Sequence, residues 1–523
     1  MFNRMKNYIY LLGISTILFA ACVEDEGNND LHPINEITIS GISDQYYVVS
    51  NAETLSITPV VTGTQSGSEN SNFEYEWFLC NQGVTDANHE HETISREAVL
   101  EFPVNVDPSN YRLYLAVTDK STGIRWEKSC LLYVLSPFVK GFYLFGNKQD
   151  GTVGLDFVGM IEGRDTTIVN DVMRNTLNLK GAQDIFFTGY YNDENSALWA
   201  ITESGSYKVE YSSTQSSFGI DEDLQPDDFI FPTLDVKRPL KCINIWPHAY
   251  GSTNLSLART ARVFCTEHEI FNGSFYGQPE AYGNPINRYS ASSSELFEPF
   301  PFAFYRYSSY VSYLAFYDVD HHRFVRLNSS LSFATNSAEI SETDGTPFYF
   351  DQTKYQPLRH LVYGENGVGN NGRSYALMKG EDNQYYVYSF NVQTTVPTKV
   401  FSRNIDLSVA TDFDKASHYT FYSMQTILLY SVGSKLYGYD YTRNEVKLLE
   451  DFGSEITYLA MDGISDDDPN EFFVATYSPS EKGVVRKLAL DDNQNEIIMT
   501  VLPQEVWKTE LRVVKVEYRN STR

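Results

Sequence analysis

The sequence predicts an all-β protein in which a β-sandwich is followed by a β-propeller-like domain of about seven blades. Short runs of alternating apolar and polar residues, bounded by Gly, Ser, Asn and Pro, fill residues 34–136. Strand–turn–strand phrases then recur at intervals of about 45–60 residues through residues 137–523. Sustained helical periodicity is scarce, which leaves β-strands as the main elements.

Residues 1–21 are expected to be the export signal of a bacterial lipoprotein. Arg4 and Lys6 give a short positive region, and the apolar stretch 8–19 is about a dozen residues long, too short to span a bilayer as a permanent helix. Two alanines then precede Cys22, whose thiol is the predicted lipidation site and the start of the mature chain. A plain secretory signal with a chance cysteine is the alternative.

Residues 22–33 are rich in acidic and amide side chains and are predicted to form a flexible acidic tether. The whole chain has 68 acidic and 40 basic side chains, which gives a formal net charge of −28. Because such a charge repels phosphate groups, nucleic acid and anionic lipid headgroups are not expected as partners. Attachment to the outer membrane is therefore expected to come from the lipid on Cys22.

The predicted sandwich, residues 34–136, is expected to bury Trp77 between its two sheets. The polar run 118–123 is predicted to be a hairpin turn between two long strands. The strands expected in this domain are 34–42, 54–61, 74–80, 98–104, 110–119 and 124–135.

The motifs of this first part carry a family resemblance. The tether after Cys22, the YEWFLC run around Trp77, the turn 118–123 and the following Trp126 resemble the PKD-like lipoproteins of Bacteroidetes, over about residues 22–160. The resemblance implies a PKD/Ig-like sandwich and display on the cell exterior. It also implies a place beside outer-membrane importers that consist of a TonB-dependent receptor and a SusD-like lipoprotein, with accessory capture of a peptide or glycan as the role.

The second predicted domain, residues 137–523, is expected to be the propeller. The closing segment 512–520 could complete the first blade and so seal the ring, and a second pair of β-sandwiches is the structural alternative. The strand–turn–strand phrases are 141–159, 184–211, 313–328, 373–392, 426–450 and 471–492.

Besides Cys22 the chain has Cys80, Cys130, Cys242 and Cys265. An even number of cysteines in an exported protein permits two disulfides, and the sequence order favours Cys80–Cys130 and Cys242–Cys265. Buried free thiols are equally compatible with the sequence.

Motifs for catalysis and cofactor binding are weak. The GxGxxG pattern at 367–372 is followed by a predicted strand instead of a helix, so it is interpreted as a loop. The histidine-containing runs 89–92 and 318–322 lack the spacing of a zinc motif, and no GxSxG nucleophile pattern occurs. We therefore expect no cofactor, no metal and no enzymatic activity, although an acid/base pair of carboxylates is defined by spatial separation that a sequence does not give.

The segment 297–313 is the strongest candidate for ligand contact, because it carries four phenylalanines and four tyrosines. Such rings can stack on sugars or on peptide side chains. Tyr305, Arg306, Tyr307 and Tyr310 are the predicted ligand-binding residues, with Arg306 placed to meet a carboxylate. The alternative is that alternate rings belong to a buried blade strand.

Together these features predict a non-enzymatic, lipid-anchored surface protein of the outer membrane. It would bind an oligomeric nutrient, either peptide or glycan, and/or dock on a TonB-dependent importer as an accessory subunit. A surface hydrolase built on the propeller, either glycosidase or peptidase, is the first alternative. A structural spacer without a ligand is the second.

Overall fold

The fold is described from a computed structural model. The predicted signal 1–21, the lipidation site Cys22 and the tether 22–33 lie outside the described residues. The structure describes residues 34–65, 72–81, 91–161, 163–188, 197–212, 217–220, 225–247, 261–274, 280–306, 311–462, 469–493 and 495–520.

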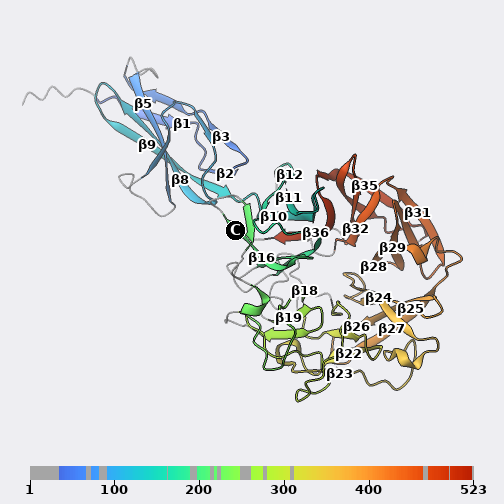
Figure 1. Ribbon diagram of the computed structural model, residues 1–523. Coiled ribbons are helices and arrows are strands. Elements are labelled where there is room, and N and C mark those ends of the chain that lie inside the picture. The colour runs from blue at the N-terminus through green and yellow to red at the C-terminus, as the bar shows by residue number, and fades with distance from the viewer. Residues whose placement is uncertain are drawn as a thin grey trace, which may run out of the picture. The chain divides into compact units, whose positions relative to one another are not determined.

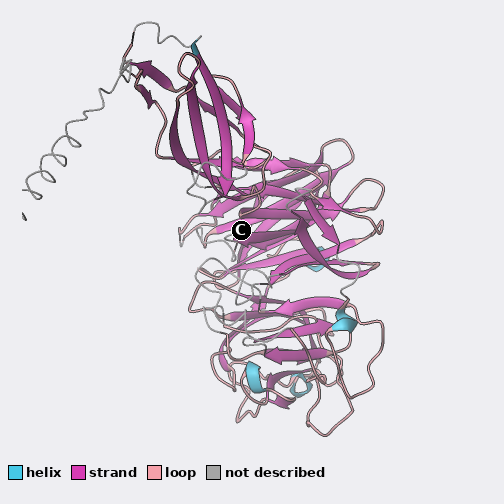
Figure 2. Ribbon diagram, turned by 90° about the vertical axis from the view of Figure 1, so that its left-hand side faces the viewer, coloured by secondary structure: helices cyan, strands magenta, loops and turns pink. Residues whose placement is uncertain are grey.

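The chain forms two compact units. The second unit consists of Val134–Arg523 together with Tyr47–Glu53 and Val104–Ser109, and the first consists of the remaining residues. Strands dominate both units, and the helical segments that the structure describes in the second are single 3₁₀ turns (Figure 2).

The sandwich is built from three small sheets with the orders β2-β9-β8-β5-β6, β1-β4 and β3-β7. Trp77 on β5 is fully buried, as predicted, and its indole Nε1 donates a hydrogen bond of 3.1 Å to the carbonyl of Glu97. The strands are β1 (Ile37–Ser40), β2 (Gln45–Val49), β3 (Thr54–Ile57), β4 (Val60–Gly63), β5 (Phe73–Asn81), β6 (Glu92–Ser95), β7 (Leu100–Pro103), β8 (Ser109–Asp119) and β9 (Arg125–Leu135).

The prediction of a single strand over residues 54–61 is wrong. The segment 54–61 forms two strands, β3 and β4, which pair with β7 and β1 in different sheets. Pro59 lies between them and has no N–H to donate to a ladder, so the chain changes sheet there. The short strands β2 and β6 were not predicted from the sequence.

The second unit contains seven sheets among the residues that the structure describes, and Figure 1 shows them arranged in a ring. The all-β, propeller-like fold is therefore as the sequence predicts. Each sheet is antiparallel apart from one short parallel pairing, β13 with β17.

The sheet orders, taken in chain order, are β12-β11-β10-β36, β13-β17-β16-β15-β14, β18-β19-β20, β21-β22-β23, β24-β25-β26-β27, β28-β29-β30-β31 and β32-β33-β34-β35. The strands of the first four sheets are β10 (Lys140–Asn147), β11 (Val153–Gly159), β12 (Thr167–Val169), β13 (Met173–Arg174), β14 (Ala182–Thr188), β15 (Ala197–Thr202), β16 (Gly205–Ser212), β17 (Ser217–Ile220), β18 (Cys242–Trp246), β19 (Ala261–Thr266), β20 (Ile270–Ser274), β21 (Ala315–Asp318), β22 (Arg323–Leu327) and β23 (Ser337–Glu339). Those of the last three sheets are β24 (Arg359–Asn366), β25 (Ser374–Gly380), β26 (Tyr385–Asn391), β27 (Thr398–Ile405), β28 (His418–Tyr422), β29 (Ile427–Val432), β30 (Lys435–Asp440), β31 (Glu445–Asp451), β32 (Glu455–Met461), β33 (Glu471–Ser478), β34 (Lys482–Leu490) and β35 (Met499–Thr509), with β36 (Arg512–Asn520) returning to the first sheet. The 3₁₀ turns are η4 (Pro226–Asp228), η5 (Leu331–Phe333), η6 (Gln352–Lys354) and η7 (Phe413–Lys415).

The last strand closes the ring. β36 pairs antiparallel with β10 from Lys140↔Asn520 to Asn147↔Arg512, so the C-terminal segment supplies the innermost strand of the first sheet. The prediction that 512–520 completes the first blade is confirmed. Thr509, which ends β35, donates a hydrogen bond to the buried carboxylate of Asp156 on β11, so a side-chain contact also joins the last sheet to the first.

Innermost strands of neighbouring sheets are in contact where β36 meets β14 and β32, where β14 meets β18, and where β28 meets β24 and β32. These strands begin at the same face of the propeller, since Lys241 beside the start of β18 bonds Gln183 near the start of β14, and Glu365 near the end of β24 bonds Phe421 near the end of β28. Arg512, the first residue of β36, forms two hydrogen bonds of 2.8 Å with Glu455, the first residue of β32. We call the face where these strands begin the leading face. The turns between the second and third strands of the sheets also lie there, because antiparallel neighbours alternate in direction; Arg359 at the start of β24, for example, is paired with Gly380.

All four described cysteines are buried free thiols, so the alternative without disulfides holds. Cys80 on β5 and Cys130 on β9 flank β8 on opposite sides, which separates them by two strand spacings, roughly 9–10 Å, too far for a bridge. Cys242 packs among the apolar residues on one side of the third sheet and Cys265 among those on the other. Burial raises the pKa of the Cys130 thiol to about 11.

Candidate functional site

The structure corrects the prediction that Tyr305 offers its ring to a ligand. Tyr305 has no exposed surface, and its ring centroid lies 6.0 Å from that of Trp246 in the core between sheets. Its backbone N–H donates to Asn366 Oδ1 at 3.0 Å. The alternative is therefore right about the burial of this ring, although Tyr305 lies outside the named strands. Tyr307 and Tyr310 lie outside the described residues.

Arg306 is used by the loop that follows β24. Its Nε donates to the carbonyl of Asn371 at 3.1 Å, and its Nη2 donates to the Asn371 side chain. This loop is the GxGxxG run 367–372, and it connects two strands, as the sequence predicts. A Cβ on Gly369 would lie 2.8 Å from the backbone N of Met424, so the glycine allows close packing against the next sheet.

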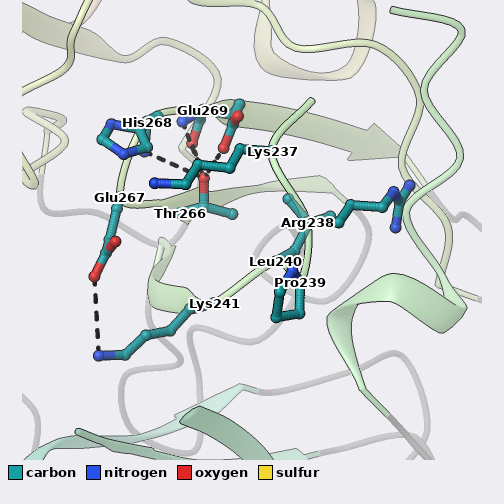
Figure 3. Close-up of a pocket in the computed structure, with 9 residues that line it drawn as sticks. All are labelled: Lys237, Arg238, Pro239, Leu240, Lys241, Thr266, Glu267, His268 and Glu269. Atoms are coloured by element: carbon teal, nitrogen blue, oxygen red, sulfur yellow. Dashed lines mark hydrogen bonds and ion pairs between the residues drawn. The ribbon is translucent and has the colours of Figure 1, made fainter. Parts of the chain in front are cut away.

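A small pocket on the leading face brings together two segments about thirty residues apart. It has a volume of about 90 Å³ and lies between the connection into β18 and the β19–β20 turn (Figure 3). Ligand pockets for drug-sized molecules are several times larger. This pocket therefore has room for one end group of a ligand and not for a whole oligomer. Its lining residues are Lys237, Arg238, Pro239, Leu240, Lys241, Thr266, Glu267, His268 and Glu269.

The pocket is unusually basic for so acidic a chain. Lys237 is exposed and forms no ion pair with any residue that the structure describes. Lys241 Nζ lies 4.0 Å from Glu267 Oε1 and 3.1 Å from Gln183 Oε1. In Figure 3 the two lysine side chains point to one side of the pocket, whereas the guanidinium of Arg238 points away from it. Lys237 is thus available to an anionic or hydroxyl-bearing group.

Arg238 serves the fold. Its guanidinium pairs with Asp227 and donates to the carbonyl of Ile230 at 3.2 Å, and Asp227 also accepts the N–H of Leu240 at 2.9 Å. These bonds fix the 237–241 segment against the turn η4. The basic segment is therefore held in one position without using the two lysines.

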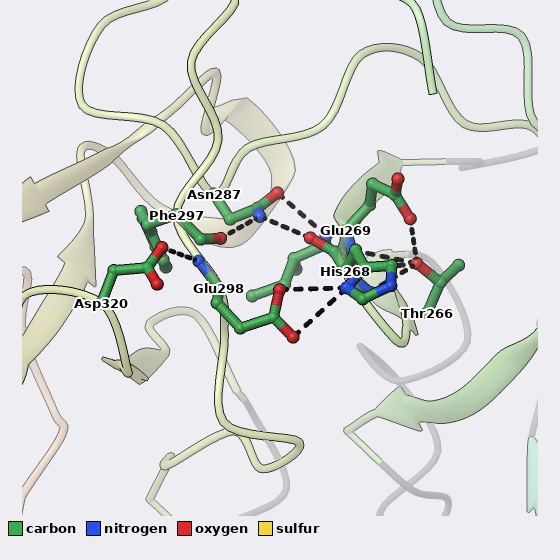
Figure 4. A network of polar contacts seen from close by, with 8 residues as sticks. Thr266, His268, Glu269, Asn287, Phe297, Glu298 and Asp320 are labelled. Carbon is green, nitrogen blue, oxygen red and sulfur yellow. Dashed lines mark hydrogen bonds and ion pairs between the residues drawn. The ribbon is translucent and has the colours of Figure 1, made fainter. Parts of the chain in front are cut away.

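The turn at 266–269 is fixed by a polar network (Figure 4). His268 Nδ1 lies 3.0 Å from Glu298 Oε2, and the N–H of Glu298 donates to Asp320 Oδ2 at 2.8 Å. The fully buried Asn287 donates from Nδ2 to the carbonyls of His268 and Phe297, at 2.9 and 2.6 Å. The aromatic segment 297–313 thus reaches this site by its first residues, and not through Tyr305 or Arg306.

The sequence contains one signal for this pocket, although the pocket was not predicted. The run Lys237-Arg238-Pro239-Leu240-Lys241 places three cations in five residues of a chain with a net charge of −28. A single sequence cannot show that the turn 266–269 lies opposite this run, because the contact depends on the pairing of β18 with β19.

The described residues also bear on metal binding and on membrane spanning. Within them, no group of three or more His, Cys, Asp or Glu side chains is arranged to hold a metal ion. His321 of the run 318–322 instead lies with Nδ1 2.8 Å from the buried carboxylate of Asp318. No helix among the described residues is long and apolar enough to cross a membrane.

The chain thus consists of a PKD-like sandwich followed by a propeller, and the propeller has a small polar site on one face. Residues 22–181 match the model of the PKD-like family. The match covers the sandwich and extends into the first strands of the propeller. No curated protein sequence matches the chain.

Several solved structures are similar to this chain. A quinonprotein alcohol dehydrogenase-like protein from Bacteroides thetaiotaomicron is similar over 93% of this chain and 99% of its own, at 12% identity and a TM-score of 0.36. The extracellular domain of a one component system from the same organism is similar over 86% of this chain and 54% of its own, at 10% identity and a TM-score of 0.32. The WD40 domain of SCAP from fission yeast is similar over 75% and 84%, at 11% identity and a TM-score of 0.21. Because these scores are low, the description of the fold rests on the strand pairings.

Proposed function

We propose that this protein is a non-enzymatic, lipid-anchored protein of the outer-membrane surface that binds an oligomeric nutrient, peptide or glycan, at the leading face of its propeller. In this proposal it acts as an accessory subunit of a TonB-dependent importer. The observation that carries the binding role is the pocket beside Lys237, which combines a rigid backbone with a cation that no described residue neutralises.

The size of the pocket narrows the binding mode. A volume of about 90 Å³ accepts a terminal sugar or one residue at the end of a peptide. The rest of the oligomer would then extend over the leading face. Lysine ammonium groups and the paired His268 and Glu298 supply both donors and acceptors, as hydroxyl-rich or amide-rich ligands require.

The anchoring role is supported by the sequence. The family match begins at residue 22, which is the predicted lipidated cysteine. The acidic residues that follow form the predicted tether to the membrane.

Binding is tested by screening the purified chain against mixed oligopeptides and oligosaccharides, followed by titration of each hit. Lys237→Gln is expected to weaken binding by roughly tenfold to a hundredfold, because a hydrogen bond to a charged group contributes about 1.5–3 kcal/mol. Lys435→Gln is the matched control, since Lys435 is exposed in another turn of the same face. Equal affinities for both variants would remove the pocket from the proposal.

Anchoring and docking are tested in cells. Cys22→Ala is expected to move the protein from the membrane fraction to the soluble fraction and to abolish labelling by a fatty acid. A pull-down of the lipidated protein from solubilised outer membranes is expected to recover a TonB-dependent receptor. Recovery of the protein alone would count against docking, and turnover of any screened ligand would favour the hydrolase instead.

A further inference from the structure

A second feature of the leading face is an arginine held between two tyrosine rings. Arg359 is the first residue of β24, and its guanidinium carbon lies 3.7 Å from the ring centroid of Tyr355 and 3.5 Å from that of Tyr386. Rings on both faces of a guanidinium leave only its edges open for hydrogen bonds. The plane of the arginine is thereby fixed before any ligand arrives.

One edge of this guanidinium is held by a buried relay. Nη1 of Arg359 donates to the hydroxyl of Tyr388 at 2.6 Å, and that hydroxyl donates to Gln352 Oε1 at 3.2 Å. The Gln352 amide in turn donates to the carbonyl of Tyr349. Tyr388 and Gln352 have no exposed surface. The relay therefore sets the rotation of the guanidinium about its own axis as well as its plane.

The remaining edge of Arg359 has no partner among the described residues. No carboxylate there forms an ion pair with it, although acidic side chains outnumber basic ones by 68 to 40. The backbone of Glu381 lies close to Arg359, since its N–H donates to the carbonyl of Leu358 at 3.0 Å. The Glu381 side chain, however, forms no ion pair with Arg359. The Nε and Nη2 atoms of Arg359 have no hydrogen-bond partner among the described residues, and they are not buried. They therefore reach solvent.

A comparison within the ring shows which group is missing. Arg512 occupies the corresponding first position of an innermost strand, and both of its terminal nitrogens bond the Glu455 carboxylate at 2.8 Å. Arg359 has the same position and the same chemistry, yet the fold supplies no carboxylate to it. A rigid guanidinium with two parallel N–H groups on its open edge is the standard partner of a carboxylate.

We propose that Arg359 is the anchor of a second binding site on the leading face, which takes a carboxylate group of a ligand between the edges of Tyr355 and Tyr386. The carboxylate can come from a uronic acid of a glycan or from the free C-terminus of a peptide. This site goes beyond the proposed function and does not depend on the pocket beside Lys237. Because the rings and the relay hold Arg359 in place, little side-chain entropy is lost on binding.

The experiment uses two matched pairs of probes with the full chain. Hexagalacturonate is compared with its methyl ester, and a neutral hexapeptide with a free C-terminus is compared with its C-terminal amide. Wild-type protein is expected to bind the acid of one pair roughly tenfold to a hundredfold more tightly than the uncharged partner. Which pair shows the difference identifies the source of the carboxylate.

Variants then assign the effect to Arg359. Arg359→Gln is expected to remove the preference for the acid, and Arg359→Lys to restore only part of it, because an ammonium does not form the bidentate contact. Tyr386→Leu keeps the charge but releases one face of the guanidinium, and it is expected to give an intermediate loss should Arg359→Gln fail to fold. Lys354→Gln is the control for a change of charge alone, since Lys354 is exposed on the neighbouring turn η6.

Each result has one reading. Equal affinity for acid and uncharged probe in wild type, or an unchanged preference in Arg359→Gln, would overturn the proposal. Loss of binding in Lys237→Gln with an intact preference in Arg359→Gln would support the pocket alone. The converse would support the Arg359 site alone.

Discussion

Glu517, on the strand that closes the ring, offers a quantitative test of how the propeller is held together. Its side chain has no exposed surface, and Oε1 accepts the N–H of Phe187 on β14 at 3.1 Å. Its Oε2 has no hydrogen-bond partner among the described residues. Burial raises the pKa of Glu517 to about 8, against the partial compensation by the nearby charge of Lys515. We therefore expect a neutral carboxyl here at pH 7.

The sign and size of the effect follow from this shift. The folded state holds a proton on Glu517 that the unfolded chain releases near pH 4.5, so this group destabilises the fold as pH rises from about 4.5 to 8. One unit of pKa corresponds to about 1.4 kcal/mol, which gives roughly 5 kcal/mol over the full range and about 3 kcal/mol between pH 5.5 and 7.5. The neutral form of Glu517 stabilises the fold fully below pH 4.5, the pKa in the unfolded chain. This contribution is lost as the pH rises through about 8, the pKa in the folded protein.

Glu517→Gln replaces the neutral carboxyl with a group of the same shape that does not titrate. We expect wild type and variant to differ little at pH 4.5 and below, and the variant to gain about 3 kcal/mol of stability relative to wild type between pH 5.5 and 7.5. Urea unfolding of the purified chain at half-unit pH steps measures this difference. Glu510→Gln, at an exposed glutamate beside β36, is the control. A free-energy difference between wild type and Glu517→Gln that stays constant with pH would refute the reasoning.

Three other predictions concern the fold. Truncation after Glu510 removes the innermost strand of the first sheet, and we expect circular dichroism to show loss of the cooperative propeller transition, whereas removal of 521–523 should leave it unchanged. Gly369→Ala is expected to lower the free energy of unfolding by about 1–3 kcal/mol through overpacking against Met424, and Gly283→Ala, which meets open space, by less than about 1 kcal/mol, both read from urea midpoints. With Cys22, the predicted lipidation site, replaced, a thiol reagent should label four cysteines in the unreduced, unfolded chain; two or none would mean disulfides.

The sequence predicts this fold well where the information is local. Alternation of apolar and polar residues together with turn residues is enough to define hairpins such as β10–β11 and β33–β34. It also identifies 512–520 as a strand that could complete the first blade, and the structure shows its pairing with β10. Pro59 shows the limit, because a run that alternates correctly can still divide between two sheets.

The candidate sites were not predictable from local pattern, because each depends on which side of a sheet a residue faces. Tyr305 lies in the most aromatic segment of the chain, and yet its ring packs against Trp246 in the core. Arg359 lies in an unremarkable run, and yet it meets Tyr386 because β24 and β26 both pair with β25. Alternation tells which residues share a side, but both sides of a propeller blade are buried against neighbours, so it does not separate ligand contacts from core.

Two cationic side chains on the leading face, Arg359 and Lys237, stand out in this acidic chain. At the start of the innermost strands, Arg512 is neutralised by a carboxylate of the fold, as is Lys241 in part, through Glu267. Arg359 and Lys237 are not neutralised by any described residue. Two positive positions without a fixed counter-charge on one face of a protein of net charge −28 create a local field opposite to that of the whole molecule. Low salt should therefore strengthen binding of an anionic ligand at these positions even though the protein as a whole repels it, and a neutral ligand should show no such salt dependence.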